Sequence, residues 1–265
     1  MSTLNLPALR KMKQDKQPIV ALTAYDYSFA SLLDQAGVDI VLVGDSLGMV
    51  IQGHESTIPV TMDDMLYHTS IVSKGLQRSF LIMDLPFMSY ATVERALDNA
   101  TLALQNTGAK MVKLEGGIDQ IPVVEALTHH DIPVCAHIGL KPQSYYKTGS
   151  YQVQGRSRKT ANHMLDEAIA LQHAGADILL VESVPHLLAE EIATNLDIPV
   201  IGIGAGSGCD GQILVLQDLL GITPGKVPSF AKNFMSESAD IRGAISRYVD
   251  DVRQRKFPSA EHSFS

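Results

Sequence analysis

The sequence has no tryptophan and few other aromatic residues, so its core must be built from aliphatic side chains. Its two cysteines, Cys135 and Cys209, are too few for a disulfide framework and offer too few ligands for a zinc site. No apolar run approaches the ~20 residues that span a bilayer, and residues 1–17 lack the apolar stretch of a signal peptide. These absences predict a cytoplasmic protein with reduced thiols and no membrane contact.

Positive charge is also scarce, because the formal net charge is −8. No basic patch with interleaved aromatic residues occurs, which argues against nucleic acid as a partner. A chain of 265 residues can form one large α/β domain or two small ones. Since no low-complexity linker divides it, we expect a single domain over 1–265.

Three segments share one pattern: AGVDIVLVGDS, TGAKMVKLEGG and AGADILLVESV. In each, a glycine (Gly37, Gly108 or Gly175) precedes an apolar run that ends on an acid. The glycine fits the left-handed end of a helix, and the apolar run fits a strand covered on both faces. The pattern predicts one helix-to-strand connection used repeatedly, with a carboxylate at the end of each strand.

Strands and helices are predicted to alternate along the whole chain. The predicted strands are 18–24, 39–44, 80–85, 110–115, 133–138, 177–182, 198–203 and 212–216. The predicted helices are 26–36, 62–77, 91–106, 118–129, 160–174, 186–195 and 236–256. QILVLQDLL, which contains the last strand, also fits a helix. Eight such units predict a (βα)₈ TIM barrel.

An open doubly wound sheet is the alternative fold, but it usually has a glycine fingerprint after its first strand, where this chain has AYDYS. Residues 3–16 are expected to add an N-terminal helix, and the tail, 257–265, is expected to be frayed or disordered. Two connections, 45–61 and 139–159, are longer than a barrel needs and follow strands. Barrel enzymes place their chemistry on that face, so we expect these loops to be functional.

A barrel would gather polar residues from several strand ends on this face. They are Asp45, Ser46, Asp84, Lys113, Glu115, His137 and Glu182. A single acid at a strand end is more often a helix cap or the partner of a nearby Lys or Arg. Four acids together with a lysine and a histidine favour a functional site.

Carboxylates without a cysteine cluster or a second histidine suit a hard cation, of which Mg²⁺ fits best. Asp45 and Asp84 are the predicted direct ligands, and Glu115 is the third, directly or through water. The alternative for Asp84 is a cap on the following helix. Lys113 would share a face of its strand with Glu115. It could form a Schiff base, bind an anionic substrate, or simply pair with Glu115 or Asp84.

The remaining residues each have a functional and a structural interpretation. Ser46 could donate to a substrate oxygen or be an ordinary loop serine. His137 is interpreted as a substrate contact or an orienting group, although a lone histidine on an apolar strand is commonly structural. Glu182 should have a raised pKa that suits a general base, unless it pairs with Lys113 or Arg156. The glycine-rich 201–211 could bind phosphate or only form a tight turn.

Several motifs together resemble the ketopantoate hydroxymethyltransferase family. They are VGDSLGMVIQGHESTIPVTMDDM, MDLPF, VKLEGG, AHIGLKPQSY, YQVQGR, VESVP and PVIGIGAGSGCDGQILVLQDLLG. They occur in the family's order and cover nearly the whole chain. Ala136 and Lys141 stand where the family is expected to have Gly and Thr, and YYKTGSYQVQGR varies around the usual double glycine.

The resemblance implies a barrel that transfers a one-carbon unit from 5,10-methylenetetrahydrofolate to 3-methyl-2-oxobutanoate, giving 2-dehydropantoate for pantothenate biosynthesis. It also implies Mg²⁺ and a homo-oligomer, typically a decamer. The family's metal positions correspond to Asp45, Asp84 and Glu115, and its proton acceptor corresponds to Glu182. Its substrate contacts correspond to Ser46 and Lys113, and Asp45, Asp84 and His137 are expected to contact substrate as well.

Two alternatives remain at this point. One is a Mg²⁺-dependent C–C lyase or mutase of the phosphoenolpyruvate mutase and isocitrate lyase group, which often has a catalytic cysteine in a long loop. Neither cysteine of this chain lies in such a loop. The other alternative is a barrel that binds a metabolite or a partner without catalysis. Dependence on folate would separate the transferase from the lyase.

Overall fold

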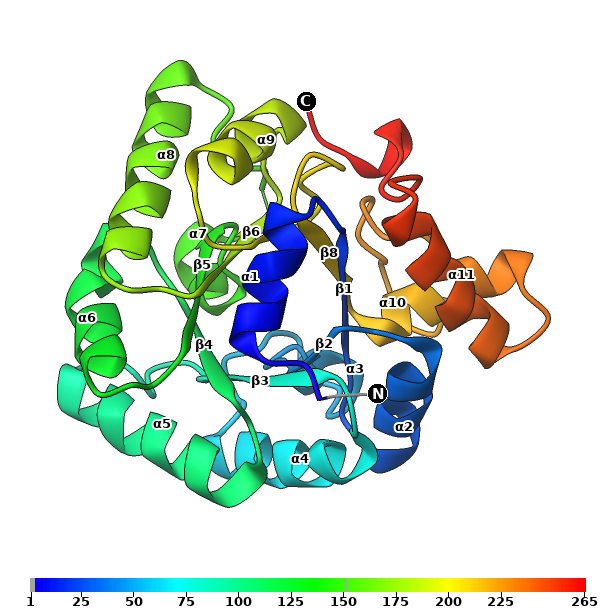
Figure 1. The fold of residues 1–265 in the computed structure, drawn as a ribbon, viewed down its shortest axis with the longest axis horizontal. Coiled ribbons are helices and arrows are strands. Elements are labelled where there is room, and N and C mark those ends of the chain that lie inside the picture. Colours follow the sequence, from blue (N-terminus) through cyan, green and yellow to red (C-terminus); the bar gives the residue numbers. More distant parts are fainter. Residues whose placement is uncertain (1–2, 151) are drawn as a thin grey trace.

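The computed structural model describes residues 3–150 and 152–265, which form a closed barrel of eight parallel strands in chain order (Figure 1). Each strand pairs with the next, and the first pairs with the last. The strands are β1 (Ile19–Thr23), β2 (Ile40–Val43), β3 (Phe80–Asp84), β4 (Met111–Glu115), β5 (Val134–Gly139), β6 (Ile178–Glu182), β7 (Val200–Ile203) and β8 (Gly211–Leu214). The predicted TIM barrel is therefore confirmed, and the open doubly wound sheet is excluded.

Helices surround the barrel, as Figure 1 shows. They are α2 (Tyr27–Ala36), α4 (Met62–Gly75), α5 (Val93–Thr107), α6 (Ile121–His129), α8 (Arg158–His173), α9 (His186–Asn195), α10 (Leu216–Leu220) and α11 (Ile241–Arg253). The segment QILVLQDLL, which fitted both a strand and a helix, contributes to β8 and then to α10. Among the described residues, no helix combines the length and the apolar character needed to cross a membrane.

The repeated helix-to-strand pattern has the predicted local cause. Gly37 and Gly108 cap α2 and α5 in the left-handed conformation, with φ of 88° and 85°. The strands that follow are buried along their whole length, because side chains facing the lumen and side chains facing the helices are both covered. The core is almost entirely aliphatic, as the shortage of aromatic residues requires.

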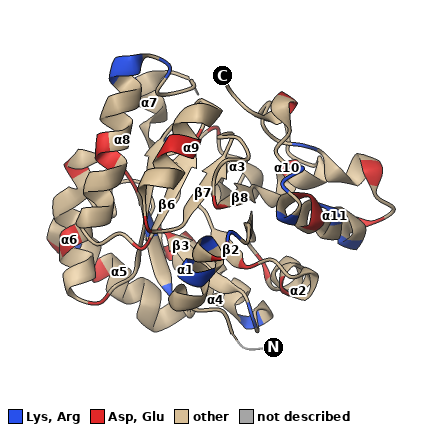
Figure 2. Cartoon of the chain, turned by 45° about the horizontal axis from the view of Figure 1, so that its top comes forward, with Lys and Arg blue, Asp and Glu red and all other residues tan. Residues whose placement is uncertain are grey.

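Helix α1 (Leu6–Gln14) confirms the extra N-terminal helix and lies across one end of the barrel (Figure 1). Its Leu9 is fully buried. Arg10 and Lys13 form ion pairs of 2.6 Å with Asp177 and Asp210, which lie immediately before β6 and β8. Figure 2 marks the basic residues that α1 brings to this end. Since α1 closes the end where strands begin, the end where strands finish is left for the site.

The tail, 257–265, does not have the frayed structure expected from its sequence. Phe257 is buried against Phe234 and Tyr248. The Phe264 carbonyl accepts a hydrogen bond of 2.8 Å from the backbone N–H of His186. The physical reason is that two aromatic side chains in a polar segment have apolar pockets to fill, which the segment's composition does not indicate.

Candidate active site

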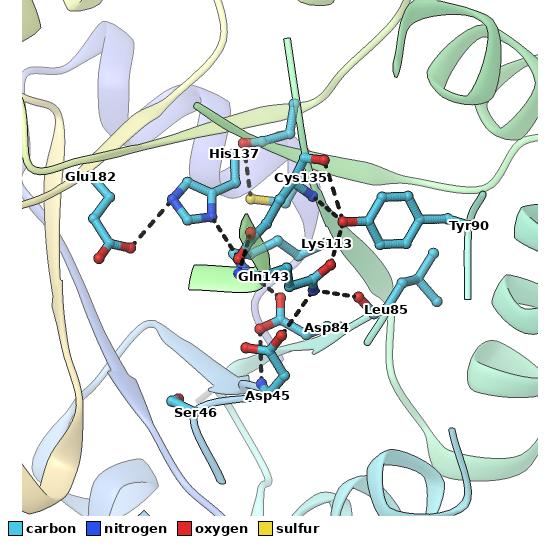
Figure 3. A network of polar contacts seen from close by, with 12 residues as sticks. Asp45, Ser46, Asp84, Leu85, Tyr90, Lys113, Cys135, His137, Gln143 and Glu182 are labelled. Atoms are coloured by element: carbon cyan, nitrogen blue, oxygen red, sulfur yellow. Dashed lines mark hydrogen bonds and ion pairs between the residues drawn. The ribbon is translucent and has the colours of Figure 1, made fainter. Parts of the chain in front are cut away.

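The seven predicted residues lie at the ends of five consecutive strands, β2 to β6. Six of them are labelled in Figure 3, where their side chains converge, and Glu115 joins them through its contact with His137. The register of the sheet aligns them in pairs, since Asp84 is opposite Lys113 and Glu115 is opposite His137. The lysine, the histidine and three of the four acids are buried. The structure therefore brings together the side chains that the sequence placed at separate strand ends.

Asp84 connects the ends of β2, β3 and β4. Its Oδ2 accepts from the backbone N–H of Asp45 at 3.0 Å, and its Oδ1 accepts from Lys113 Nζ at 2.5 Å. Asp84 is not a helix cap, because Thr92 caps α5. Burial by itself would lower the pKa of Lys113, but the carboxylates of Asp84, Glu115 and Asp45 outweigh burial and raise it. Lys113 is therefore a fixed ammonium ion, which does not suit a Schiff-base nucleophile.

Gly44, which precedes Asp45, packs closely against two side chains of the site. A Cβ at this position would lie 2.9 Å from Ser46 Oγ and 3.4 Å from Asp84 Oδ2. A side chain at this position would displace the Ser46 hydroxyl. Ser46 Oγ lies 2.8 Å from the hydroxyl of Tyr25, a buried residue that the sequence argument did not select. Tyr25 follows β1 in AYDYS, and only the fold brings it to Ser46.

Gln143 is the main residue that sequence reasoning missed. It lies in a short 3₁₀ turn (Pro142–Ser144) of the loop after β5, and it is buried. Its Nε2 donates to Asp45 Oδ2 at 2.8 Å and to the Leu85 carbonyl at 3.0 Å. Its Oε1 accepts from Tyr90 Oη at 2.5 Å. The signal was present in AHIGLKPQSY, but a glutamine in a loop is not distinctive by itself.

The buried carboxyl groups of Asp45, Asp84 and Glu115 outnumber the one buried ammonium group among them, that of Lys113. Burial, followed by the charges of Asp84 and Glu115, raises the pKa of Asp45 well above its ordinary value. Burial also raises the pKa of Glu115 to about 7, although Lys113 acts in the opposite direction. Glu115 Oε2 accepts from the backbone N–H of Gln143 at 3.1 Å, whereas Oε1 has no hydrogen-bond partner in the described part of the chain.

His137 lies between two acids. Its Nδ1 is 3.6 Å from Glu115 Oε1, and its Nε2 is 3.3 Å from Glu182 Oε2. Neither ring nitrogen makes a hydrogen bond of good geometry to a described residue. Burial and the charge of Lys113 lower the pKa of His137, so the ring is neutral near pH 7. Its ring therefore lies beside Glu115 and Glu182 at the strand ends.

Glu182 is the most accessible of the acids, with 15% of its side chain exposed. Burial raises the pKa of its carboxyl, and the contact with His137 opposes that shift. Within the described residues, the titratable side chain that Glu182 contacts is His137, rather than Lys113 or Arg156. A carboxylate with a raised pKa and an exposed edge can accept a proton from a bound molecule.

The glycine-rich 201–211 has a structural explanation. A Cβ at Gly206 would lie 2.4 Å from His186 Cβ, and one at Gly211 would lie 2.5 Å from the carbonyl of Ile19. A Cβ at Gly204 would lie 2.7 Å from the ring of Phe230. Close packing between neighbouring segments therefore accounts for these glycines.

The donor set fits a divalent cation held by few protein ligands. Within residues 3–150 and 152–265, no group of three His, Cys, Asp or Glu side chains is arranged to enclose a metal ion. Mg²⁺ does not need such a group, because it typically uses one or two carboxylates and keeps water and substrate in its other positions. Asp45 and Asp84 are adjacent, and the unpartnered Glu115 Oε1 lies in the same buried cluster.

Comparison with known proteins agrees with the sequence motifs. Residues 3–260 match the family described as ketopantoate hydroxymethyltransferase. A 3-methyl-2-oxobutanoate hydroxymethyltransferase of Alkalilimnicola ehrlichii is 55% identical over 97% of this chain and 92% of its own. One from a Shewanella species is 54% identical over the full length of both chains.

Among solved structures, a phosphonopyruvate hydrolase in complex with oxalate and Mg²⁺ superposes with a TM-score of 0.63. It covers 99% of this chain and 93% of its own at 14% sequence identity, which supports the fold alone. The family match and the full-length relatives show the family of the chain as well as its fold. The chain belongs to the ketopantoate hydroxymethyltransferase family.

Proposed function

We propose that the chain transfers a hydroxymethyl group from 5,10-methylenetetrahydrofolate to 3-methyl-2-oxobutanoate, with Mg²⁺, to give 2-dehydropantoate for pantothenate biosynthesis. One observation carries the proposal. This chain, which belongs to the family, buries Asp45, Asp84 and Glu115 together with Lys113, and it leaves Glu182 partly accessible beside them. A cluster so negative suits a cation and a substrate acid that binds through that cation.

Asp45 and Asp84 are the proposed cation ligands, and Glu115 is the third, directly or through water. The choice of Mg²⁺ rests on the buried carboxylate oxygens, which are the ligands that this ion prefers. When bound, the ion would supply Lewis acidity toward the keto and carboxylate oxygens of the substrate. Lys113, fixed by Asp84 at 2.5 Å, offsets part of the negative charge that develops on the substrate.

Glu182 is the proposed general base. It takes the proton from C3 of 3-methyl-2-oxobutanoate, and the resulting enolate carbon attacks the methylene group of the folate. The methylene carbon carries two bonds to folate nitrogens, and both must break. Water replaces the nitrogens on this carbon and becomes the hydroxyl oxygen, C3 forms its new bond to the same carbon, and the two nitrogens take up the C3 proton and one proton of the water. His137 is neutral and 3.3 Å from Glu182 Oε2, so it can orient the carboxylate without neutralising it. Ser46 is a proposed substrate contact.

Chemistry on the cysteines is disfavoured. Cys135 and Cys209 are both buried, and burial raises the pKa of each thiol to about 12. Neither lies in the loops at the open end of the barrel, where the lyase and mutase group often has a catalytic cysteine. The family match and the buried thiols therefore favour the transferase over that group.

The proposal is tested by following 3-methyl-2-oxobutanoate with Mg²⁺ in D₂O by proton NMR. The transferase should exchange the C3 proton and should form dehydropantoate only when methylenetetrahydrofolate is added. Cleavage of a C–C bond without folate would identify a lyase. A barrel that only binds would give neither exchange nor product, and either result would refute the proposed function.

A further inference from the structure

We propose that Gln143 is a positioning residue that sets the affinity of the cation site by fixing the carboxylates of Asp45 and Glu115. The inference rests on the proposed function, since it concerns the same site. Gln143 comes from the loop 139–159, yet it is buried among groups from β2, β3 and β4 (Figure 3). It touches two proposed ligands without being one of them.

The orientation of the Gln143 amide follows from its surroundings. The Leu85 carbonyl can only accept a hydrogen bond, so the amide atom 3.0 Å away must be the NH₂ group. The same NH₂ group donates to Asp45 Oδ2 at 2.8 Å. The amide oxygen on the other side accepts from Tyr90 Oη at 2.5 Å. Rotation of the amide by 180° would place its oxygen against the Leu85 carbonyl and the Asp45 carboxylate and lose both of those bonds, so the donor stays directed at Asp45.

The backbone of Gln143 acts on a second strand. Its N–H donates to Glu115 Oε2 at 3.1 Å and leaves Glu115 Oε1 without a hydrogen-bond partner in the described chain. One loop residue thus holds carboxylates from β2 and β4 at the same time. A third carboxylate, Asp84, is held by Lys113 instead.

A neutral donor is suited to this task. Hydrogen bonds from groups around a metal site orient the ligating carboxylates, and their loss typically weakens metal binding about 10–100-fold. An amide orients Asp45 and leaves its negative charge for the ion, whereas a second lysine would cancel that charge. Anchoring the loop alone would need only the contacts with Leu85 and Tyr90. The bond to Asp45 is the one that a merely structural role does not require.

The test measures Mn²⁺ binding directly, by electron paramagnetic resonance of the free ion, with the full-length protein and no substrate. Gln143→Met keeps the length of the side chain and the backbone N–H to Glu115, but it removes the donor to Asp45. Gln152→Met is the matched control, because Gln152 is an exposed residue of the same loop. We expect the Mn²⁺ dissociation constant of Gln143→Met to rise by about 10–100-fold. The control should match wild type.

An increase of less than about fivefold in Gln143→Met, below the range that lost orienting bonds usually give, would overturn the inference. If wild type itself bound no Mn²⁺, the proposed function would fail first, and the two failures are therefore distinguishable. If Gln143→Met does not fold, as judged by circular dichroism, Tyr90→Phe takes its place. That variant loses the hydroxyl that holds the amide oxygen and that also contacts the backbone of Glu115, so unchanged Mn²⁺ binding refutes the inference.

Discussion

Replacement of Glu182 by glutamine tests the assignment of the general base. The substitution keeps the size of the side chain and removes only its ability to accept the C3 proton. Glu182 contacts His137 at its partly exposed edge and makes no bond to the proposed cation ligands within the described residues. The fold and the cation site should therefore be preserved, while the proton-transfer step loses its base.

The expected loss follows from the role. A positioned general base contributes about 10²–10⁴-fold, which corresponds to roughly 3–5 kcal/mol of activation free energy. Deuterium exchange at C3 of 3-methyl-2-oxobutanoate, with Mg²⁺ and without folate, isolates this step from methylene transfer. Rate constants for exchange should fall by that factor, with Mn²⁺ affinity and melting temperature close to wild type.

Glu191→Gln is the matched control for this experiment. Glu191 is exposed on α9, near Glu182 in sequence, and makes no described side-chain contact with the site. It should exchange C3 protons at the wild-type rate. A Glu182→Gln protein that exchanges as fast as this control would remove Glu182 from the role of base, and a lumenal group other than Glu182 would have to replace it.

Three further predictions follow from burial and charge. First, C3 exchange should fall with acid at a higher pH than an ordinary carboxyl would give, because burial raises the pKa of Glu182; a rate profile from pH 4 to 8 checks this. Second, Lys113→Met should lower the free energy of unfolding by about 3–5 kcal/mol in urea titrations, since it leaves buried Asp84 unpaired. Third, Asp34→Asn should destabilise the protein by about 1–3 kcal/mol at pH 7, because Asp34 Oδ1 accepts from the backbone N–H and the hydroxyl of Ser79. Burial raises the pKa of Asp34, but these hydrogen bonds outweigh burial and lower it. The stability that Asp34 contributes is therefore present above the pKa of the unfolded chain, and it is lost as the pH falls through the lower pKa of the folded protein. The difference between wild type and Asp34→Asn should shrink in acid, and a constant difference would contradict this reasoning.

The barrel could be predicted from the sequence because its signals are local. A glycine that closes a helix, a short apolar strand and an acid at the strand end occur within eleven residues of one another, as in TGAKMVKLEGG. Three segments carry this pattern, and strands alternate with helices along the rest of the chain. Closure of the resulting eight-stranded sheet places Asp45, Asp84, Glu115 and Glu182 on the same face. No long-range information is needed for that step.

The contacts between loops could not be predicted in the same way. Gln143 lies in a loop, so no strand register fixes its neighbours. Its hydrogen bonds with Asp45 and Tyr90 depend on the path of that long loop over the barrel. The tail is a similar case, because Phe257 packs against Tyr248 of α11 and Phe264 packs against Phe230, both of which precede the tail in separate segments. Periodicity describes strands and helices, whereas the route of a loop depends on the surface below it.

The final residues of the chain lie closer to the chemistry than their position in the sequence suggests. The Phe264 carbonyl holds the backbone of His186, and Pro185 pairs with Phe264, only a few residues after Glu182. Removing residues 264–265 would thus loosen the backbone that carries the proposed base, while the buried Phe257 and its packing stayed in place. Shortened versions judged by yield or solubility alone would pass that screen and still be poor catalysts.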